Sequence, residues 1–138
     1  WFKTAEPRVR FDLEQITGTV PIIKAYAGMG IGDGIISLLD PEKIDGVVIE
    51  ALGAGNLPPL AAREITSLMD KGVPVVLVSR CFNGIAEPVY AYEGGGVKLQ
   101  EAGVMFVKEL NAPKARLKLL IALSAGLEGQ ELKDYIEG

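Results

Sequence analysis

The segment from Gly46 to Pro59, GVVIEALGAGNLPP, constrains the fold of this chain more than any other. Its β-branched run is typical of a buried strand, and the two glycines that follow permit a tight turn. Two prolines then open a stretch with apolar residues at helical spacing, and proline is well tolerated in the first turn of a helix. The segment therefore predicts a strand–turn–helix unit with Asn56 just beyond the carboxyl end of the strand.

The same alternation of apolar runs and amphipathic stretches extends along the chain. We expect strands over residues 20–26, 46–52, 73–79 and 103–107. We expect helices over residues 34–40, 58–71, 97–102, 111–125 and 129–137. Strands that alternate with helices predict a parallel sheet covered on both faces. The predicted fold class is therefore α/β: a three-layer, Rossmann-like domain over residues 19–138 with a roughly four-stranded parallel sheet, preceded by a polar linker or arm over residues 1–18.

Charge and composition exclude several classes of partner. The formal net charge of the 138 residues is −4 and no cluster of Lys and Arg interrupts it, so we expect no nucleic-acid partner. No apolar run approaches the roughly 20 residues that span a bilayer, so we expect no membrane partner either. The single cysteine, Cys81, excludes an internal disulfide framework and favours a reducing, cytoplasmic location.

The chain contains no histidine. Histidine is the commonest general base and the commonest metal ligand, so histidine-based triads and histidine-ligated zinc are excluded within this chain. We therefore expect no metal site. Cys81 lacks a histidine partner that could activate it as a nucleophile, and we predict that it packs as a small hydrophobic residue after the third strand.

The glycine-rich turn Gly28–Asp33 is a candidate for nucleotide binding. It lies between a predicted strand and a predicted helix, and Glu50 follows about 20 residues later, as in dinucleotide-binding domains. However, Asp33 stands where the third glycine of that fingerprint would be, and a carboxylate at a helix start repels a pyrophosphate. Asp33 is better interpreted as the N-cap of the helix that we expect next.

The turn Gly53–Asn56 is the second glycine-rich candidate. It departs from the dinucleotide fingerprint because Pro58 occupies the third position. Two interpretations stay open from the residues alone. The turn is either a cradle for a ligand, or a plain turn in which the Asn56 side chain bonds local backbone.

A long loop, Cys81–Gly96, follows the third predicted strand. Loops of this length in a compact domain are more often functional than not. Tyr92 and Glu93 stand immediately before three glycines, which permit a close approach of backbone. The alternative is an aromatic ring packed at the edge of the sheet with a solvated carboxylate beside it.

Several motifs together resemble the C-terminal domain of bacterial L-asparaginases. The resemblance runs from about Thr19 to Leu123, with the motifs in the family's order and spacing. They are VPIIKAY, GVVIEALGAGNL, GVPVVLVSRCFNG, AYEGGG, EAGVMF and LNAPKARLKLLIAL.

The resemblance implies a hydrolase that converts asparagine to aspartate and ammonia without a metal or an organic cofactor. The family's threonine nucleophile and its partners lie in a larger N-terminal domain, and the family's Thr-Gly-Gly-Thr and Thr-Asp-Thr motifs are absent here. We therefore expect no catalytic residue in this chain and no activity from it alone.

The resemblance also implies binding residues for the substrate. The family's G-x-G-N asparagine, which is Asn56 here, helps to hold the amino end of the substrate in the active site of a neighbouring subunit. A second contact is either the tyrosine of a Tyr-x-x-Gly motif, matched by Tyr92, or a carboxylate, for which Glu93 is available. The partners implied are asparagine and further copies of the enzyme, as a dimer or tetramer.

Three other interpretations remain open at this point. The chain could be a nucleotide-binding half-domain or a free-standing interaction module. Within the family, it could belong to an enzyme that also accepts glutamine, or to the related amidotransferase subunit that acts on charged transfer RNA.

Overall fold

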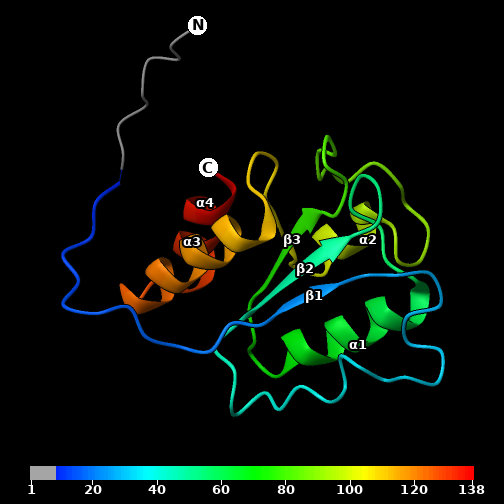
Figure 1. Ribbon diagram of the computed structural model, residues 1–138, viewed down its shortest axis with the longest axis horizontal. Coiled ribbons are helices and arrows are strands. Elements are labelled where there is room, and N and C mark those ends of the chain that lie inside the picture. The colour runs from blue at the N-terminus through cyan, green and yellow to red at the C-terminus, as the bar shows by residue number, and fades with distance from the viewer. Residues whose placement is uncertain (1–8) are drawn as a thin grey trace, which may run out of the picture.

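The computed structural model describes residues 9–138 (Figure 1). The strands are β1 (Ile22–Lys24), β2 (Val47–Ala51), β3 (Val75–Ser79) and β4 (Met105–Phe106). The helices are α1 (Pro59–Asp70), α2 (Gly96–Glu101), α3 (Ala112–Ser124) and α4 (Gly129–Glu137). All four strands are parallel and lie side by side in the order β1-β2-β3-β4. The predicted α/β fold with a four-stranded parallel sheet is confirmed.

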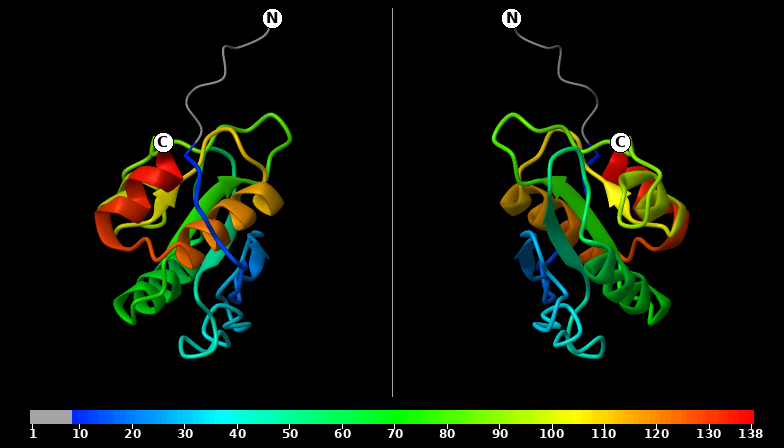
Figure 2. Two further views of the ribbon diagram at one scale, coloured as in Figure 1. Left: turned by 90° about the vertical axis from the view of Figure 1, so that its left-hand side faces the viewer. Right: turned by 90° about the vertical axis from the view of Figure 1, so that its right-hand side faces the viewer.

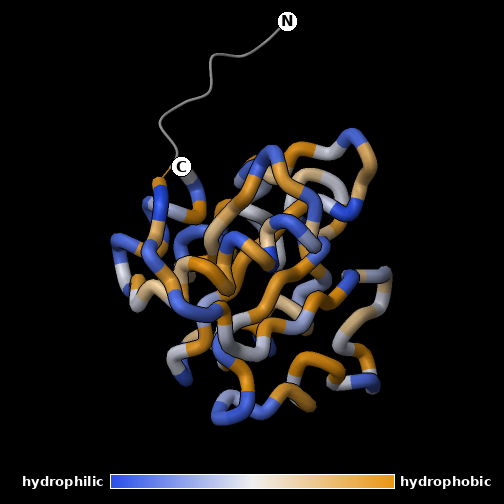
Figure 3. The backbone as a smooth tube through the Cα atoms, turned by 60° about the vertical axis from the view of Figure 1, so that its left-hand side comes forward, coloured by the Kyte–Doolittle hydropathy of each residue, from blue (hydrophilic) through white to orange (hydrophobic). Residues whose placement is uncertain are grey.

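Different helices cover the two faces of the sheet (Figure 2). Because successive side chains of a strand point to opposite faces, the strands contribute side chains to two apolar clusters, one on each face of the sheet. Ile49 and Leu77 pack with Ile65 of α1 on one face. Val48 packs with Leu119 of α3 and with α4 on the other face. Hydrophobic stretches pass through the centre of the molecule, and the outer loops carry both hydrophilic and hydrophobic stretches (Figure 3).

The ends of the longer helices follow from local sequence. Pro59 occupies the first turn of α1, and Gly72, with φ of +88°, donates its N–H to the carbonyl of Met69 just past the end of that helix. Asn111 caps α3, since its side-chain oxygen accepts from the N–H of Lys114. All three residues were predicted to mark helix ends, and each lies at a helix end in the structure.

The helix expected over residues 34–40 is wrong. The chain after β1 forms a series of turns, in which only the N–H of Leu38 reaches back four residues, to the carbonyl of Gly34. Gly28, Gly30 and Gly32, which precede the predicted helix, and Gly34, its first residue, all have φ between +52° and +88°, so the backbone enters this segment outside the right-handed helical region. Leu38 is 79% exposed, so the apolar face that the sequence predicted is only partly buried.

All four strands are shorter than predicted, and the difference is largest in β1 and β4, which lie at the edges of the sheet. Val20 precedes β1 and is buried, but its carbonyl accepts from the Nε of Arg116 instead of a strand. In β4, the N–H of Phe106 donates to a carboxylate oxygen of Glu137, at 3.0 Å. Side chains of α3 and α4 thus satisfy backbone groups at both edges.

Residues 9–18 form no helix or strand and pass beside α3 and α4 (Figure 1). The Phe11 ring meets the Tyr135 ring edge to face, at 5.2 Å between centroids. The backbone of Thr17 exchanges two hydrogen bonds with the hydroxyl of Ser124. The interpretation of residues 1–18 as a linker stays a prediction, and residues 1–8 lie outside the part that the structure describes. Among the described residues, none of the helices has both the length and the apolar character to cross a bilayer.

Candidate functional site

The carboxyl ends of three strands are tied together by side chains that follow β3. The hydroxyl of Ser79 donates to the carbonyl of Gly53, at 2.6 Å. The Nη1 of Arg80 donates to the carbonyl of Ala25, just past β1, at 3.0 Å. Ligands of parallel α/β sheets bind outside this edge, so the loops after β1, β2 and β3 form the candidate site.

The turn after β2, residues Leu52–Asn56, is here called the Asn56 turn. Its two end residues exchange backbone hydrogen bonds, each of 2.9 Å. Gly55 has a φ of +117°, and a Cβ there would lie 2.8 Å from the Phe106 ring and 3.1 Å from a methyl group of Leu77. The core residues therefore leave the backbone of the Asn56 turn almost no room to move.

The side chain of Asn56 is half-buried at the end of this turn. The backbone of Asn56 makes the local hydrogen bonds, whereas its side-chain amide makes none with residues 9–138. An amide carries both donors and an acceptor, and each can be offered to a ligand. The sequence left two interpretations of this turn open. The structure does not show the one in which the Asn56 side chain bonds local backbone.

A second turn, residues Tyr92–Gly95 and here called the Tyr92 turn, lies beside the first. The N–H of Gly95 closes it on the carbonyl of Tyr92, at 2.8 Å. The carbonyl of Gly94 accepts from the N–H of Leu57, also at 2.8 Å, and Leu57 directly follows Asn56. A Cβ on Gly94 would lie 2.2 Å from the Leu57 carbonyl oxygen, so only glycine permits this approach. The structure thus brings together the backbone segments that carry all three predicted site residues.

Tyr92 and Glu93 differ in their surroundings. The Tyr92 ring is 54% exposed and leans against the ring of Tyr90, at 5.9 Å between centroids. Glu93 accepts a hydrogen bond from the Nε of Arg63 on α1, at 2.5 Å. That hydrogen bond from Arg63 holds the pKa of Glu93 below its usual range. The carboxylate is therefore already paired with a cation, while the phenol is not.

Cys81 is not buried as predicted. Its thiol is free and exposed, and its carbonyl accepts from the N–H of Gly84 in a tight turn. The physical reason is that the chain leaves the sheet at Ser79, whose hydroxyl accepts from the N–H of Cys81 and turns the backbone outward. Cys81 lines a polar cavity of about 470 Å³ with Arg80 and Asn83.

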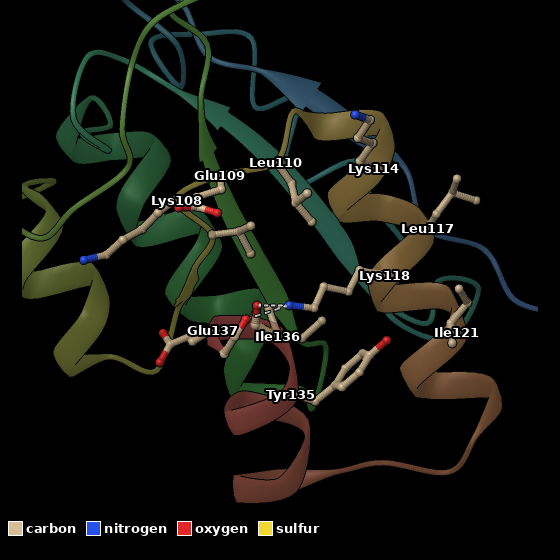
Figure 4. Close-up of a pocket in the computed structure, with 12 residues that line it drawn as sticks. Lys108, Glu109, Leu110, Lys114, Leu117, Lys118, Ile121, Tyr135, Ile136 and Glu137 are labelled. Carbon is tan, nitrogen blue, oxygen red and sulfur yellow. Dashed lines mark hydrogen bonds between the residues drawn. The ribbon is translucent and has the colours of Figure 1, made fainter. Parts of the chain in front are cut away.

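A cavity of about 830 Å³ lies between α3 and α4 and holds no comparable site (Figure 4). Leu117 and Ile121 supply much of its apolar wall. Lys118 points to the end of α4, where its Nζ donates to the carbonyls of Ile136 and Gly138. Burial lowers the pKa of Lys118, and two hydrogen bonds to backbone carbonyls already hold its ammonium group. This hollow therefore presents little uncommitted polar chemistry.

The nucleotide interpretation of the Gly28–Asp33 turn gains no support from the geometry. A carboxylate oxygen of Asp33 accepts from the N–H of Gly30, at 2.9 Å, and the other accepts from the hydroxyl of Tyr26. These bonds hold the pKa of Asp33 below its usual range, with Tyr26 the larger cause, so the turn presents negative charge. Glu50, the expected ribose contact, lies 3.5 Å from the Nζ of Lys24. Within residues 9–138, no cluster of three or more acidic or sulfur side chains has the geometry of a metal site.

Sequence reasoning missed the side chains that hold the site in place. Ser79 and Arg80 were visible as polar residues after a buried strand, a position that predicts the carboxyl edge but not the partner. Arg63 carried no signal, because its partner Glu93 is 30 residues away along the chain.

The fold and the site define the class of protein as a parallel α/β domain with convergent loops at the carboxyl edge of its sheet. Residues 19–136 match the family model of the glutaminase/asparaginase C-terminal domain. The chain belongs to this family, as the resemblance implied.

Three relatives illustrate the match. The chain is 43% identical over 133 residues to a probable L-asparaginase of Deinococcus radiodurans, covering 96% of this chain and 39% of that protein. It is 31% identical over 132 residues to one subunit of the glutamyl-tRNA(Gln) amidotransferase of Pyrococcus furiosus, covering 95% of this chain and 29% of that protein. The crystal structure of L-asparaginase I from Vibrio cholerae superposes with a TM-score of 0.74 at 26% identity, covering 97% and 40% of the two chains. This chain therefore spans well under half the length of the proteins that it matches.

Proposed function

We propose that this chain is the C-terminal domain of an L-asparaginase, which hydrolyses L-asparagine to L-aspartate and ammonia without a cofactor. The identity of 43% with the probable L-asparaginase of Deinococcus radiodurans supports this assignment. Hydrolysis of an amide requires an activated nucleophile and donors for the oxyanion. We assign both to a preceding domain, so the chain alone is inactive.

The contribution of this domain is substrate binding at a site completed by a neighbouring subunit. The observation that carries the proposal is the hydrogen bond from Leu57 to Gly94, which fixes Asn56 beside the Tyr92 turn. The amide of Asn56 can accept from the α-ammonium group of asparagine, and a phenol or carboxylate beside it can do the same. The enzyme is then a homo-oligomer, a dimer or tetramer, in the cytoplasm.

The test is an assay of ammonia release on two proteins. A longer protein in which this domain follows a Thr-Gly-Gly-Thr domain should release ammonia from asparagine, and the 138-residue chain alone should not exceed a blank without protein. Ammonia release by the chain alone would contradict the assignment of the nucleophile. A longer protein without any activity on asparagine would contradict the proposed function.

The match to the Pyrococcus furiosus amidotransferase supports a second candidate within the family. In that case, the longer protein would supply ammonia to a partner subunit that acts on charged transfer RNA. Release of free ammonia from asparagine by the purified protein, with no transfer RNA present, favours the hydrolase. The same assay with glutamine establishes which amide is preferred.

A further inference from the structure

Two contacts join the Tyr92 turn to the segment that begins at Asn56 and continues into α1. One is the backbone hydrogen bond between Leu57 and Gly94, which no substitution of a side chain removes directly. The other is the ion pair between Arg63 and Glu93, with 2.5 Å between Nε and Oε1. Glu93 lies within the turn, one residue after Tyr92, so its ion pair is a side-chain contact between that turn and α1.

Arg63 is carried by the same rigid element that follows Asn56. Helix α1 begins three residues after Asn56, and its buried residues Ala62 and Ile65 flank Arg63 and pack against the sheet. The ion pair therefore ties the Tyr92 turn to a helix whose position is fixed relative to Asn56. Two side chains from distant segments can bind one small ligand only if their spacing is maintained.

The surroundings of Glu93 are unsuited to a cationic group of a substrate. Arg63 occupies one carboxylate oxygen, and both residues line a hollow of about 330 Å³ that also includes Lys98. An ammonium group that approached Glu93 would meet two side chains of its own charge. Tyr92 has no charged partner among residues 9–138, and its ring is 54% exposed.

We propose that Arg63 is a positioning residue, which holds the Tyr92 turn against the Asn56 turn, and that Glu93 is its partner and not a contact for substrate. The inference rests on the proposed function and deepens it, since it chooses Tyr92 over Glu93 as the second binding residue. Arg63 and Glu93 have side chains that are 66% and 55% exposed. An exposed pair contributes little to global stability and is screened by salt, so its effect is local.

The first experiment measures amide hydrogen exchange in the 138-residue chain at low salt. We expect Arg63→Gln to speed exchange at the N–H groups of Leu57 and Gly95 by about threefold or more, and the charge reversal R63E/E93R to restore the slow rate. The variant Lys43→Gln, which removes the exposed pair with Asp40 away from this hollow, serves as the matched control and should leave both amides unchanged. Unchanged exchange in both Arg63→Gln and Glu93→Gln, with an unchanged melting temperature, would overturn the proposal.

The second experiment distinguishes positioning from substrate contact in the longer enzyme. The charge reversal restores the ion pair but leaves no carboxylate at position 93. If Glu93 only positions, Arg63→Gln raises KM for asparagine severalfold with kcat within about twofold, and the reversal returns KM to its original value. If the reversal restores amide protection but KM stays raised, Glu93 binds substrate and the proposal is overturned. A longer protein inactive on asparagine contradicts the proposed function alone, because the exchange measurement still decides the role of Arg63.

Discussion

The turns after β1 and β2 are both rich in glycine, yet the structure uses them differently. In the Gly28–Gly34 turns, a Cβ at Gly28 or Gly32 would meet nothing within 4 Å, and no helix follows. In the Asn56 turn, a Cβ at Gly55 would overlap the Phe106 ring, and α1 begins directly afterwards. The first turn packs only at Gly30, where a Cβ would lie 2.9 Å from the backbone nitrogen of Ala61 in α1, and is open at Gly28 and Gly32, while the second is packed against the neighbouring strands.

The difference lies in the neighbours of each turn. Strand β1 is at the edge of the sheet, so its turn has one neighbouring strand, whereas β2 lies between β1 and β3. Residues from β3 and β4, Leu77 and Phe106, therefore cover the Asn56 turn and fix it. A pattern of glycines predicts a turn, but only its place in the sheet determines whether that turn can hold a side chain in one position.

The largest expected effect comes from adding a methyl group to each turn. Gly55→Ala should lower the free energy of unfolding by about 3 kcal/mol, because the backbone strain of a positive φ adds to overpacking. Gly28→Ala, also at positive φ but in open space, should cost about 1 kcal/mol. Urea denaturation measures both. Equal losses would show that the Asn56 turn is no more constrained than the first.

A smaller effect is expected from removing a hydroxyl beside each turn. Ser79→Ala leaves the carbonyl of Gly53 without its donor and the N–H of Cys81 without its acceptor, and should cost about 1 kcal/mol. Ser37→Ala removes an exposed hydrogen bond to Glu64 near the first turn and should stay within about 0.5 kcal/mol of the original protein. Thermal or urea unfolding of the two variants provides the comparison. A loss in Ser37→Ala as large as that in Ser79→Ala would contradict the distinction.

The smallest effect concerns pH, and it should be confined to the first turn. The pKa of Asp33 is lowered in the folded protein, so ionised Asp33 stabilises the turn above the usual carboxyl pKa of about 3.9. That contribution is lost as the pH falls through the lower folded value. Hydrogen bonding of the Gly30 N–H to Asp33 should weaken over this range, as followed by its NMR amide shift, whereas the Asn56 N–H, bonded to a carbonyl, should not follow this titration. If the amide shifts of Gly30 and Asn56 changed together over this pH range, the effect would not be confined to the first turn.

Much of the fold was predictable because its central elements have strong local signals. Strands β2 and β3 are unbroken apolar runs, and Pro59 and Gly72 mark the ends of α1. The helix predicted after β1 failed because its apolar spacing was given more weight than the glycines, whose positive φ values set the local conformation. Cys81 was predicted to be buried because the strand before it is, but the chain turns outward within two residues.

The residues of the candidate site could be predicted from the sequence, but the contacts that hold them in place could not. The resemblance selected Asn56, Tyr92 and Glu93, and the hydrogen bond of Leu57 to Gly94 brings their backbone segments together. Nothing in the sequence indicates that Glu93 is paired with Arg63, because such a contact depends on how α1 and a distant loop pack. The roles of the three residues in binding stay predictions.

The central claim is that Asn56 is one part of a substrate site whose chemistry lies in another domain. The most direct measurement is the steady-state kinetics of Asn56→Ala in the longer enzyme, with the exposed Asn83→Ala at the same edge as control. We expect Asn56→Ala to raise KM for asparagine and to lower kcat/KM by the equivalent of about 1–3 kcal/mol, the scale of one lost polar contact, with little change in the control. Kinetics of Asn56→Ala that match those of the original enzyme would contradict the claim that the Asn56 side chain binds substrate.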